Sequence, residues 1–360
     1  MPRLVIYAGF HKSGTTAVQA ALMGKRQELK QLGIYYPEGH GKYAQHRLAK
    51  ITERDTLAKA RKAITKLTKR HNLVLLASEF FSELKASDIA ELVDSAGSNT
   101  SIEVFFSARR LDKVVPSQYQ QFVRSGYTKA PGEYFTNLLE EPDTDHETRL
   151  FWKRHSYDLI VERWAKALGP SQVHVVFVDE LQPEFLMQFF ETQLGLPEGL
   201  LSGSDKIRLN RSLDSEELAL VIALRKELGP TRVESEWAPI FREKFIASMA
   251  SSASPNPESK KIGLSEALTK NYLRVAGEQE SAIRKLGVLT KGQWPSASDE
   301  AIISSDLIPS HVYIETVAKA IATIKPKHYL AHASVPRLFA EIRKRIVTKL
   351  TSFFSRDTLE

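Results

Sequence analysis

The stretch LVIYAGFHKSGTT, residues 4–16, decides the fold of this chain. Residues 4–8 are a continuous apolar run, which is typical of a strand buried on both faces of a parallel sheet. A loop with glycine at positions 9 and 14 follows, and residues 15–33 then carry apolar side chains at helical spacing up to Gly33. A strand, a glycine loop and a helix in this order make the first half of a βαβ unit.

The same alternation of apolar runs and amphipathic segments continues to about residue 200. Residues 127–150 are polar and turn-rich, so we expect a long loop there that could serve as a lid. The pattern predicts an α/β protein with a P-loop-like three-layer fold, in which helices flank a central parallel sheet, and a helical C-terminal part. Further strands are expected at 72–78, 102–107 and 172–181, and helices at about 45–70, 80–96, 150–168 and 183–196, with one more ending at Gly126 and only helices beyond Asn210.

We expect residues 1–290 to form one domain, with an α/β core up to about residue 200 and a helical part after it. Residues 291–360 are expected to be a C-terminal extension with a basic amphipathic helix at about 336–354. Two interpretations of that helix stay open: it docks on the domain or on a second subunit, or it lies on an anionic membrane surface.

Composition narrows the class of protein. The chain has no cysteine, which excludes disulfides, thiolate metal sites and a cysteine nucleophile, and fits a cytoplasmic protein. No apolar run is long enough for a membrane span, and the N-terminal residues are predicted to be a strand rather than a signal peptide. The net charge of +7 favours an anionic ligand or surface. No nucleic-acid-binding motif is present, so we expect no nucleic-acid partner.

The glycine loop differs from nucleotide-hydrolysing P-loops in the position of its lysine. Those loops have the pattern G-x-x-x-x-G-K-[ST], with the lysine after the second glycine. Gly9 and Gly14 keep the glycine spacing, but Thr15 stands at the lysine position and Lys12 lies inside the loop. Backbone N–H groups of such a loop bind phosphate, and Lys12 would lie over its mouth, beside an oxygen leaving from that phosphate. A strand-to-helix turn without any ligand is the alternative.

A second anion site is predicted after the third strand. Arg109 stands at the carboxyl edge of that strand and Ser117 lies in the first turns of the next helix, so both can face the crevice where open α/β sheets bind ligands. Arginine and a hydroxyl near a helix start suit a phosphate. No clear metal-binding aspartate follows the second or third strand, which argues for a ligand handled without Mg²⁺. A solvated arginine with no ligand is the alternative.

At this point the chain resembles a known family. FHKSGTT, residues 10–16, is similar to the 5′-phosphosulfate loop of PAPS-dependent sulfotransferases, usually P-K-[ST]-G-T-T, with His11 in place of the proline. The spacing from Arg109 to Ser117 resembles the family's 3′-phosphate motif. Supporting segments, similar to landmarks of bacterial carbohydrate-type sulfotransferases over residues 3 to 290, are GIYYP (33–37), LASEFF (76–81), VFVDEL (176–181), FFETQLGL (189–196) and LNRSL (209–213).

The resemblance implies the donor 3′-phosphoadenosine 5′-phosphosulfate (PAPS), the product PAP and no metal. The backbone and the hydroxyls of the segment from Ser13 through Gly14 and Thr15 to Thr16 would cradle the 5′-phosphate. Lys12 would stabilise charge on the bridging oxygen as the sulfuryl group leaves. Arg109 and Ser117 would hold the 3′-phosphate. The acceptor would be a hydroxyl, or less favourably an amine, of a carbohydrate or glycolipid.

Other site residues are less specific. Sulfuryl transfer needs a base near the acceptor, and Glu79 after the second strand and His46 are both candidates. His11 adjoins Lys12 and could contact the donor or the acceptor, with a role in packing the loop as the alternative. Arg211 is a candidate for contact with the nucleotide, because the corresponding segment of relatives lies near it. The R-K-G segment that closes over the nucleotide in cytosolic animal sulfotransferases is not evident.

Three functions stay open at this stage. The favoured one is a PAPS-dependent sulfotransferase, cytoplasmic or peripheral to the inner membrane. A P-loop small-molecule kinase would need Mg²⁺ and a displaced phosphate lysine, for which Lys12 is poorly placed. A protein that binds nucleotide or sulfated glycan without catalysis is the third. The sequence leaves the oligomeric state open.

Overall fold

The computed structural model describes residues 1–37, 54–178, 182, 184–202, 211–232, 241–251 and 261–294. Contacts divide the chain into two compact units. The first consists of 1–115, 141–207 and 267–300, and the second of 116–140, 208–266 and 301–360. The predicted C-terminal helix at 336–354 and residues 38–53, which include His46, lie outside the described residues.

The first unit is built on a six-stranded parallel sheet with the strand order β2-β3-β1-β4-β5-β6. The predicted α/β class and parallel sheet are therefore confirmed. The strands are β1 (Arg3–Tyr7), β2 (Ile34–Tyr35), β3 (Leu73–Ala77), β4 (Ser101–Arg109), β5 (Val173–Val178) and β6 (Leu289–Lys291).

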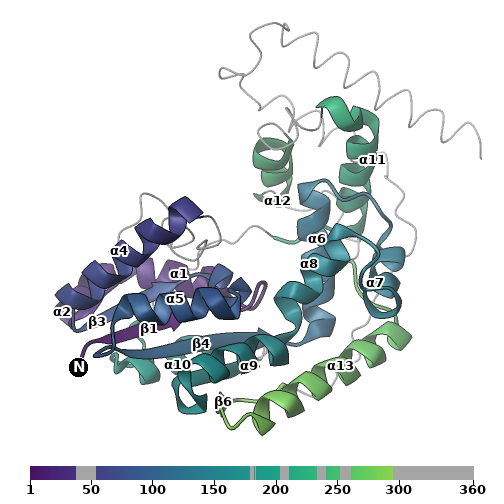
Figure 1. Ribbon diagram of the computed structural model, residues 1–360. Helices are drawn as coiled ribbons and strands as arrows, with labels where there is room; N and C mark the ends of the chain where they lie inside the picture. The colour runs from purple at the N-terminus through teal and green to yellow at the C-terminus, as the bar shows by residue number, and fades with distance from the viewer. Residues whose placement is uncertain are drawn as a thin grey trace, which may run out of the picture. The chain divides into compact units, whose positions relative to one another are not determined.

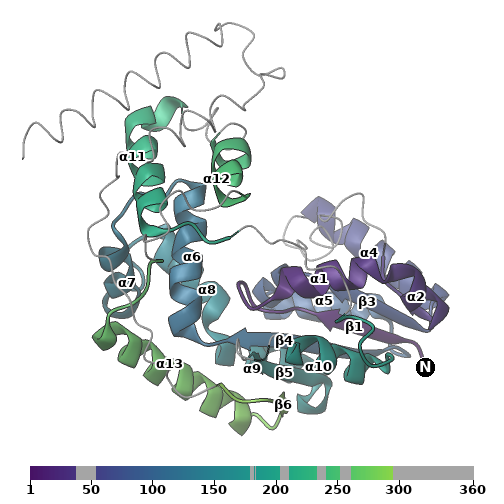
Figure 2. The same cartoon turned by 180° about the vertical axis from the view of Figure 1, so that it is seen from behind.

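Helices cover both faces of this sheet (Figures 1 and 2). On one face, the helices α1, α2 and α10 bury apolar side chains against Tyr7, Phe105 and Val176, which are all fully buried. On the other face, helices α4, α5 and α9 lie side by side. The helices of this unit are α1 (Thr15–Gly24), α2 (Arg26–Gln31), α4 (Arg54–Arg70), α5 (Ala86–Ala96), α8 (His146–His155), α9 (Tyr157–Leu168), α10 (Phe185–Leu194) and α13 (Glu266–Lys285), with short 3₁₀ turns η1 (Glu79–Glu83) and η2 (Pro170–Gln172).

The second unit is helical in its described part. Helix α6 (Leu111–Ser125) begins in the first unit and continues into the second, which also contains α7 (Pro131–Glu140), α11 (Ser215–Arg232) and α12 (Ala247–Ser251). Its core includes a cluster of aromatic rings from α6, α7 and the segment between them: Tyr119, Phe122, Tyr127, Tyr134 and Phe135.

Three sequence predictions were wrong in detail. Residues 127–150 are not a long loop, because α7 and the start of α8 lie there. The predicted lid depended on a long loop and therefore loses its basis. The turn residues that suggested a loop cap these helices: the Asp145 carboxylate accepts from the Thr148 N–H at 2.8 Å and starts α8. The single helix expected at 150–168 is two helices separated at Ser156. The region beyond residue 210 is not only helical, since β6 extends the sheet beside β5.

Candidate functional site

The glycine loop lies where the sheet topology predicts a ligand. In the strand order, the connection that follows β1 leads to β2 at one edge of the sheet. The connection that follows β4 leads in the opposite direction, to β5. Because β1 and β4 are neighbours in register, their carboxyl ends lie side by side at this switch point, where open α/β sheets bind ligands. Residues 8–14 connect β1 to α1 at that edge.

The loop backbone adopts conformations that only a few residues tolerate. Gly9 has φ +51° and Gly14 has φ +92°. A Cβ on Gly9 would come within 2.8 Å of the Thr15 Oγ1 atom, so no side chain fits there. Lys12 has φ +64° and is the one non-glycine residue with positive φ in the described part of the chain. Such backbone strain in a non-glycine residue is typical of functional sites.

A buried chain of hydroxyl groups fixes this loop. The Tyr7 hydroxyl lies 2.7 Å from Ser107 Oγ, which lies 2.8 Å from Ser13 Oγ, and Ser13 donates to the Phe10 carbonyl oxygen at 2.6 Å. Burial raises the pKa of Tyr7 well above its usual value, so its hydroxyl stays protonated and can donate. Thr15 also donates to the Phe10 carbonyl oxygen, at 3.1 Å. The hydroxyls of Ser13 and Thr15 are thus engaged within the protein.

The start of α1 suits an anion. Its N-cap is Gly14, no side chain caps its first N–H groups, and its first turn contains no acidic residue. Those N–H groups and the positive end of the helix dipole favour a negatively charged ligand. Thr16 is exposed in the first turn, so its hydroxyl and the backbone N–H groups can reach a ligand there.

The structure brings Arg109 to the loop. Its Nη1 atom donates to the Lys12 carbonyl oxygen at 3.4 Å, and its own carbonyl oxygen accepts from the Tyr157 hydroxyl at 3.0 Å. The neighbouring Arg110 is buried and bonds to Asp112 through two atoms, at 2.7 and 2.9 Å. Arg110 is therefore structural. Ser117 lies on α6 in the second unit, and its pairing with Arg109 stays a prediction.

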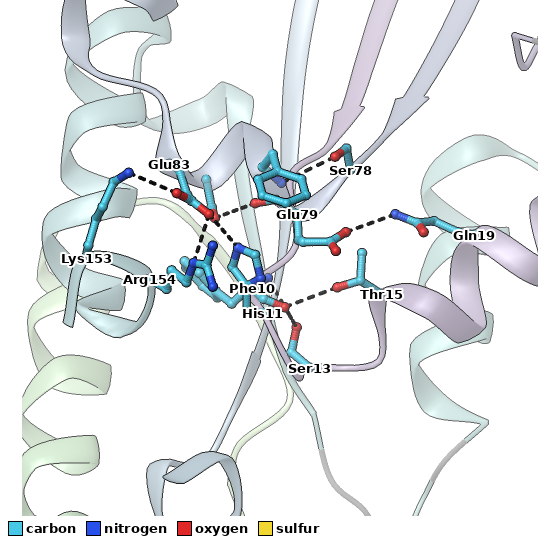
Figure 3. A network of polar contacts seen from close by, with 12 residues as sticks. Phe10, His11, Ser13, Thr15, Gln19, Ser78, Glu79, Glu83, Lys153 and Arg154 are labelled. Atoms are coloured by element: carbon cyan, nitrogen blue, oxygen red, sulfur yellow. Dashed lines mark hydrogen bonds and ion pairs between the residues drawn. The ribbon is translucent and has the colours of Figure 1, made fainter. Parts of the chain in front are cut away.

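Glu79, one of the two predicted bases, lies near the loop. It is the first residue of η1, directly beyond β3 and Ser78, and its Oε2 atom accepts from Gln19 Nε2 of α1 at 3.2 Å (Figure 3). Gln19 also donates to the Ala77 carbonyl oxygen at 3.3 Å. Glu79 is therefore held by a neutral amide and is only partly buried.

Glu83 is a second carboxylate beside the loop, and the sequence analysis missed it. It accepts from His11 Nε2, from Lys153 Nζ and from Arg154 Nε, each at 2.9 Å (Figure 3). Burial alone would raise the pKa of Glu83, but the hydrogen bond from His11 and the charge of Arg154 outweigh it and lower the pKa strongly. Glu83 is therefore ionised. Its partners are 70 or more positions away in the chain, so no local motif could have indicated this cluster.

Two histidines, one partly buried and one fully buried, lie together at this cluster. His11 and His155, the last residue of α8, have ring centroids 6.5 Å apart in an edge-to-face arrangement. Burial lowers the pKa of both, and the charge of Arg154 lowers them further, so both rings are neutral at pH 7. His155 is fully buried, and neither of its ring nitrogens has a hydrogen-bond partner among the described residues.

Arg211, the predicted nucleotide contact, lies in the second unit and has a structural role there. Its guanidinium forms two bonds to the buried Glu217 carboxylate, at 2.6 and 2.5 Å, and one to the Met249 carbonyl oxygen at 3.2 Å. Glu217 also accepts from the Asp214 N–H at 3.0 Å, near the start of α11.

Two searches of the described ranges gave negative results. No helix in those ranges is both long and apolar enough to span a membrane. No three histidine, aspartate or glutamate side chains in them are grouped as a metal ion would need.

Comparison with known proteins adds one similarity. Among solved structures, the chain is similar to the crystal structure of a sulfotransferase from Alicyclobacillus acidocaldarius, at 18% sequence identity and a TM-score of 0.38, over 62% of this chain and 92% of that chain. No protein-family model and no curated protein matches the chain. At this identity and TM-score, the similarity carries no weight in assigning a function.

Proposed function

We propose that this protein is a PAPS-dependent sulfotransferase, which moves a sulfuryl group from PAPS to a hydroxyl of a carbohydrate or glycolipid and releases PAP. The observation that carries the proposal is the position of Lys12. It lies in a positive-φ conformation inside a phosphate-type loop, two residues before Gly14, the N-cap of α1. Thr15 stands directly after the second glycine, at the position where an NTPase requires a lysine.

In this proposal the loop and α1 hold the 5′-phosphate. The hydroxyls of Ser13 and Thr15 form hydrogen bonds inside the loop, which supports a structural role for them. In this proposal the backbone N–H groups and Thr16 contact the phosphate. Lys12 stabilises the negative charge that grows on the bridging oxygen as the sulfuryl group leaves. His11, next to Lys12, is bonded to Glu83 rather than to another part of the loop.

Arg109 and Ser117 bind the 3′-phosphate in this proposal. The partial exposure of Arg109 and its contact with the Lys12 carbonyl oxygen support its share, since both place the guanidinium at the loop. Arg211 is not needed, because its ion pair with Glu217 already occupies the guanidinium. The base that accepts the proton of the acceptor remains to be assigned, with Glu79 and His46 as the residues that the sequence suggested.

Ligand-induced thermal stabilisation tests the donor assignment. Adenosine 3′,5′-bisphosphate should raise the melting temperature clearly more than ATP with Mg²⁺ does at the same concentration, because stabilisation of the folded state increases with the affinity of the ligand. Equal stabilisation, or a preference for ATP with Mg²⁺, would remove the proposal in favour of a kinase.

The Lys12→Ala variant separates an enzyme from a protein that only binds its ligand. It should lose transfer of ³⁵S from labelled PAPS by about 10²–10³-fold, since that is the usual effect of removing one group that stabilises transition-state charge. Bisphosphate binding should change by less than about tenfold. If the wild-type protein binds the bisphosphate but labels nothing in an extract of glycans and lipids, a non-catalytic function is favoured.

A further inference from the structure

We propose that His11, held through its Nε2 atom by Glu83, is the base that takes the proton from the acceptor hydroxyl. This inference rests on the proposed sulfotransferase function and assigns the group that it leaves open. Glu83 is a positioning residue in this assignment. Glu79 and His46 are the competing assignments.

The bonds around Glu83 fix which nitrogen of His11 carries the proton. Glu83 receives bonds from Lys153, from Arg154 and from His11, each at 2.9 Å. An ionised carboxylate can only accept hydrogen bonds, so the Nε2 atom of His11 must be the donor. A neutral ring that is protonated at Nε2 has its lone pair on Nδ1. Nδ1 of His11 is therefore the atom that can accept a proton.

The groups around His11 act on its charge in opposite directions, and burial decides the outcome. They are Lys12 in the loop, Glu79 and Glu83 in η1, and Arg154 and His155 at the end of α8. Burial is the largest influence on the ring and lowers its pKa, and Arg154 acts in the same direction against the two glutamates. A base must be unprotonated before it acts, and this environment meets that condition at pH 7.

His155 is a second polar group of this cluster, and its ring nitrogens are unsatisfied within the described residues. Its ring is fully buried, lies edge-to-face to His11, and has no hydrogen-bond partner for either nitrogen within the described residues. Buried polar atoms in folded proteins are nearly always paired, and exceptions at a site often mark the place of a ligand or an ordered water.

The position of His11 also suits the reaction. It precedes Lys12, so the group that accepts the proton and the group that stabilises the leaving oxygen come from adjacent residues of one rigid loop. The acceptor O–H bond breaks as its proton moves to Nδ1, and the acceptor oxygen forms a bond to sulfur. The bond from sulfur to the bridging oxygen breaks, and its electron pair stays on the 5′-phosphate of PAP. His11 then releases its proton to solvent.

The first test needs no acceptor. The full-length protein, labelled with ¹⁵N-histidine and saturated with adenosine 3′,5′-bisphosphate, should show at pH 7 a His11 ring protonated at Nε2 and bare at Nδ1. The His11→Gln variant assigns the signals by their loss. A His11 ring protonated at Nδ1, in either a neutral or a charged form, would overturn the proposal. A failure of the bisphosphate to bind would instead count against the proposed function itself.

The second test uses transfer of ³⁵S from labelled PAPS to an extract of glycans and lipids. His11→Gln should lower transfer by about 10²–10⁴-fold, the usual contribution of a general base, with bisphosphate affinity unchanged within a few-fold. His146→Gln is the matched control, because His146 is an exposed histidine at the start of α8. Loss of transfer in Glu79→Gln together with full activity in His11→Gln would overturn the assignment.

The pH dependence tests the positioning role of Glu83. The hydrogen bond and charge of Glu83 raise the pKa of His11, so Glu83→Gln should lower it. Transfer by Glu83→Gln should then be slower at its maximum, while the acidic limb of the kcat profile moves to lower pH. A protein that is merely destabilised would show no such shift. An acidic limb that stays in place or moves upward would contradict the role of Glu83.

Discussion

The guanidinium of Arg109 donates a hydrogen bond of 3.4 Å to the carbonyl oxygen of Lys12, although 97 positions separate the two residues. The contact arises from the sheet: β1 and β4 are adjacent and parallel, so the loop after one and the last residue of the other meet at the same edge. The side chain thereby braces the residue whose backbone has positive φ. Arg109 is thus both a candidate ligand group and a support for the loop.

We predict that Arg109→Ala weakens binding of adenosine 3′,5′-bisphosphate by about 10–100-fold, which corresponds to the loss of a charged hydrogen bond. The measurement is calorimetric titration at fixed salt. The melting temperature should change little, because the side chain is partly exposed. An affinity within twofold of the wild-type value would exclude Arg109 from the donor site.

Arg110→Ala is the matched control, and its effect should be on stability. Its ion pair with Asp112 is buried, and removing one partner of such a pair costs about 3–5 kcal/mol because the other charge stays buried. Denaturant unfolding measures this loss. If Arg110→Ala reduced ligand affinity more than Arg109→Ala, the roles of the two arginines would be reversed.

A second prediction concerns the loop backbone. Gly9→Ala should lower the free energy of unfolding by about 1–3 kcal/mol, since alanine is strained at φ +51° and its Cβ would collide with Thr15. Gly24→Ala at the end of α1 is the control. Nothing lies within 4 Å of a Cβ there and its φ is not positive, so this change should be neutral or stabilising by up to about 1 kcal/mol. Urea unfolding followed by circular dichroism compares the two variants.

Much of the fold could be predicted from the sequence, because it depends on local patterns. The apolar runs that became β1, β3, β4 and β5 are buried on both faces and were recognisable as such. The two-residue β2 and three-residue β6 were missed, since strands this short have no periodicity to detect.

Sequence patterns indicated only those candidate site residues that lie in or directly beside a local motif. The loop around Lys12 is a local motif, and Arg109 follows a recognisable strand. Glu83 and His155 had no signal, because their roles come from the packing of η1 and α8 against the loop. An ion cluster formed by distant residues depends on tertiary structure, which periodicity and spacing do not encode.

A third prediction concerns the buried hydroxyl chain beneath the loop. Ser107→Ala should cost about 1–3 kcal/mol in unfolding free energy, because it leaves the hydroxyls of Tyr7 and Ser13 with fewer buried partners. Adding Tyr7→Phe should then cost less than Tyr7→Phe costs alone, since its partner is already gone. A double-mutant cycle by denaturant unfolding measures this coupling. Strict additivity of the two substitutions would show that the hydroxyls do not stabilise one another.

A fourth prediction concerns acid sensitivity. Burial lowers the pKa of His155 well below the usual value, and the charges of His11, Arg154 and Lys12 lower it further. In the unfolded chain this histidine takes up a proton as the pH falls through about 6.5, while in the folded state it stays neutral. The unfolded state therefore binds more protons, and stability falls with pH by up to about 1.4 kcal/mol per unit below pH 6.5. His11 and His174, whose pKa values burial also lowers, act in the same direction.

The His155→Phe variant measures how much His155 alone contributes to the pH dependence of stability. Phenylalanine retains an aromatic ring that can pack against Phe151 and Tyr157. It lacks the two buried ring nitrogens of His155, which have no hydrogen-bond partners among the described residues. The variant should be at least as stable as the wild type at pH 7.5 and should gain on it steadily between pH 6.5 and 5. Thermal unfolding across that range makes the comparison, with His146→Phe as the exposed control on the same helix. If the stability difference between variant and wild type is the same at all pH values, His155 takes up a proton in the folded state as it does in the unfolded chain. The conclusion that His11 and His155 are a neutral pair beside Lys12 would then be wrong.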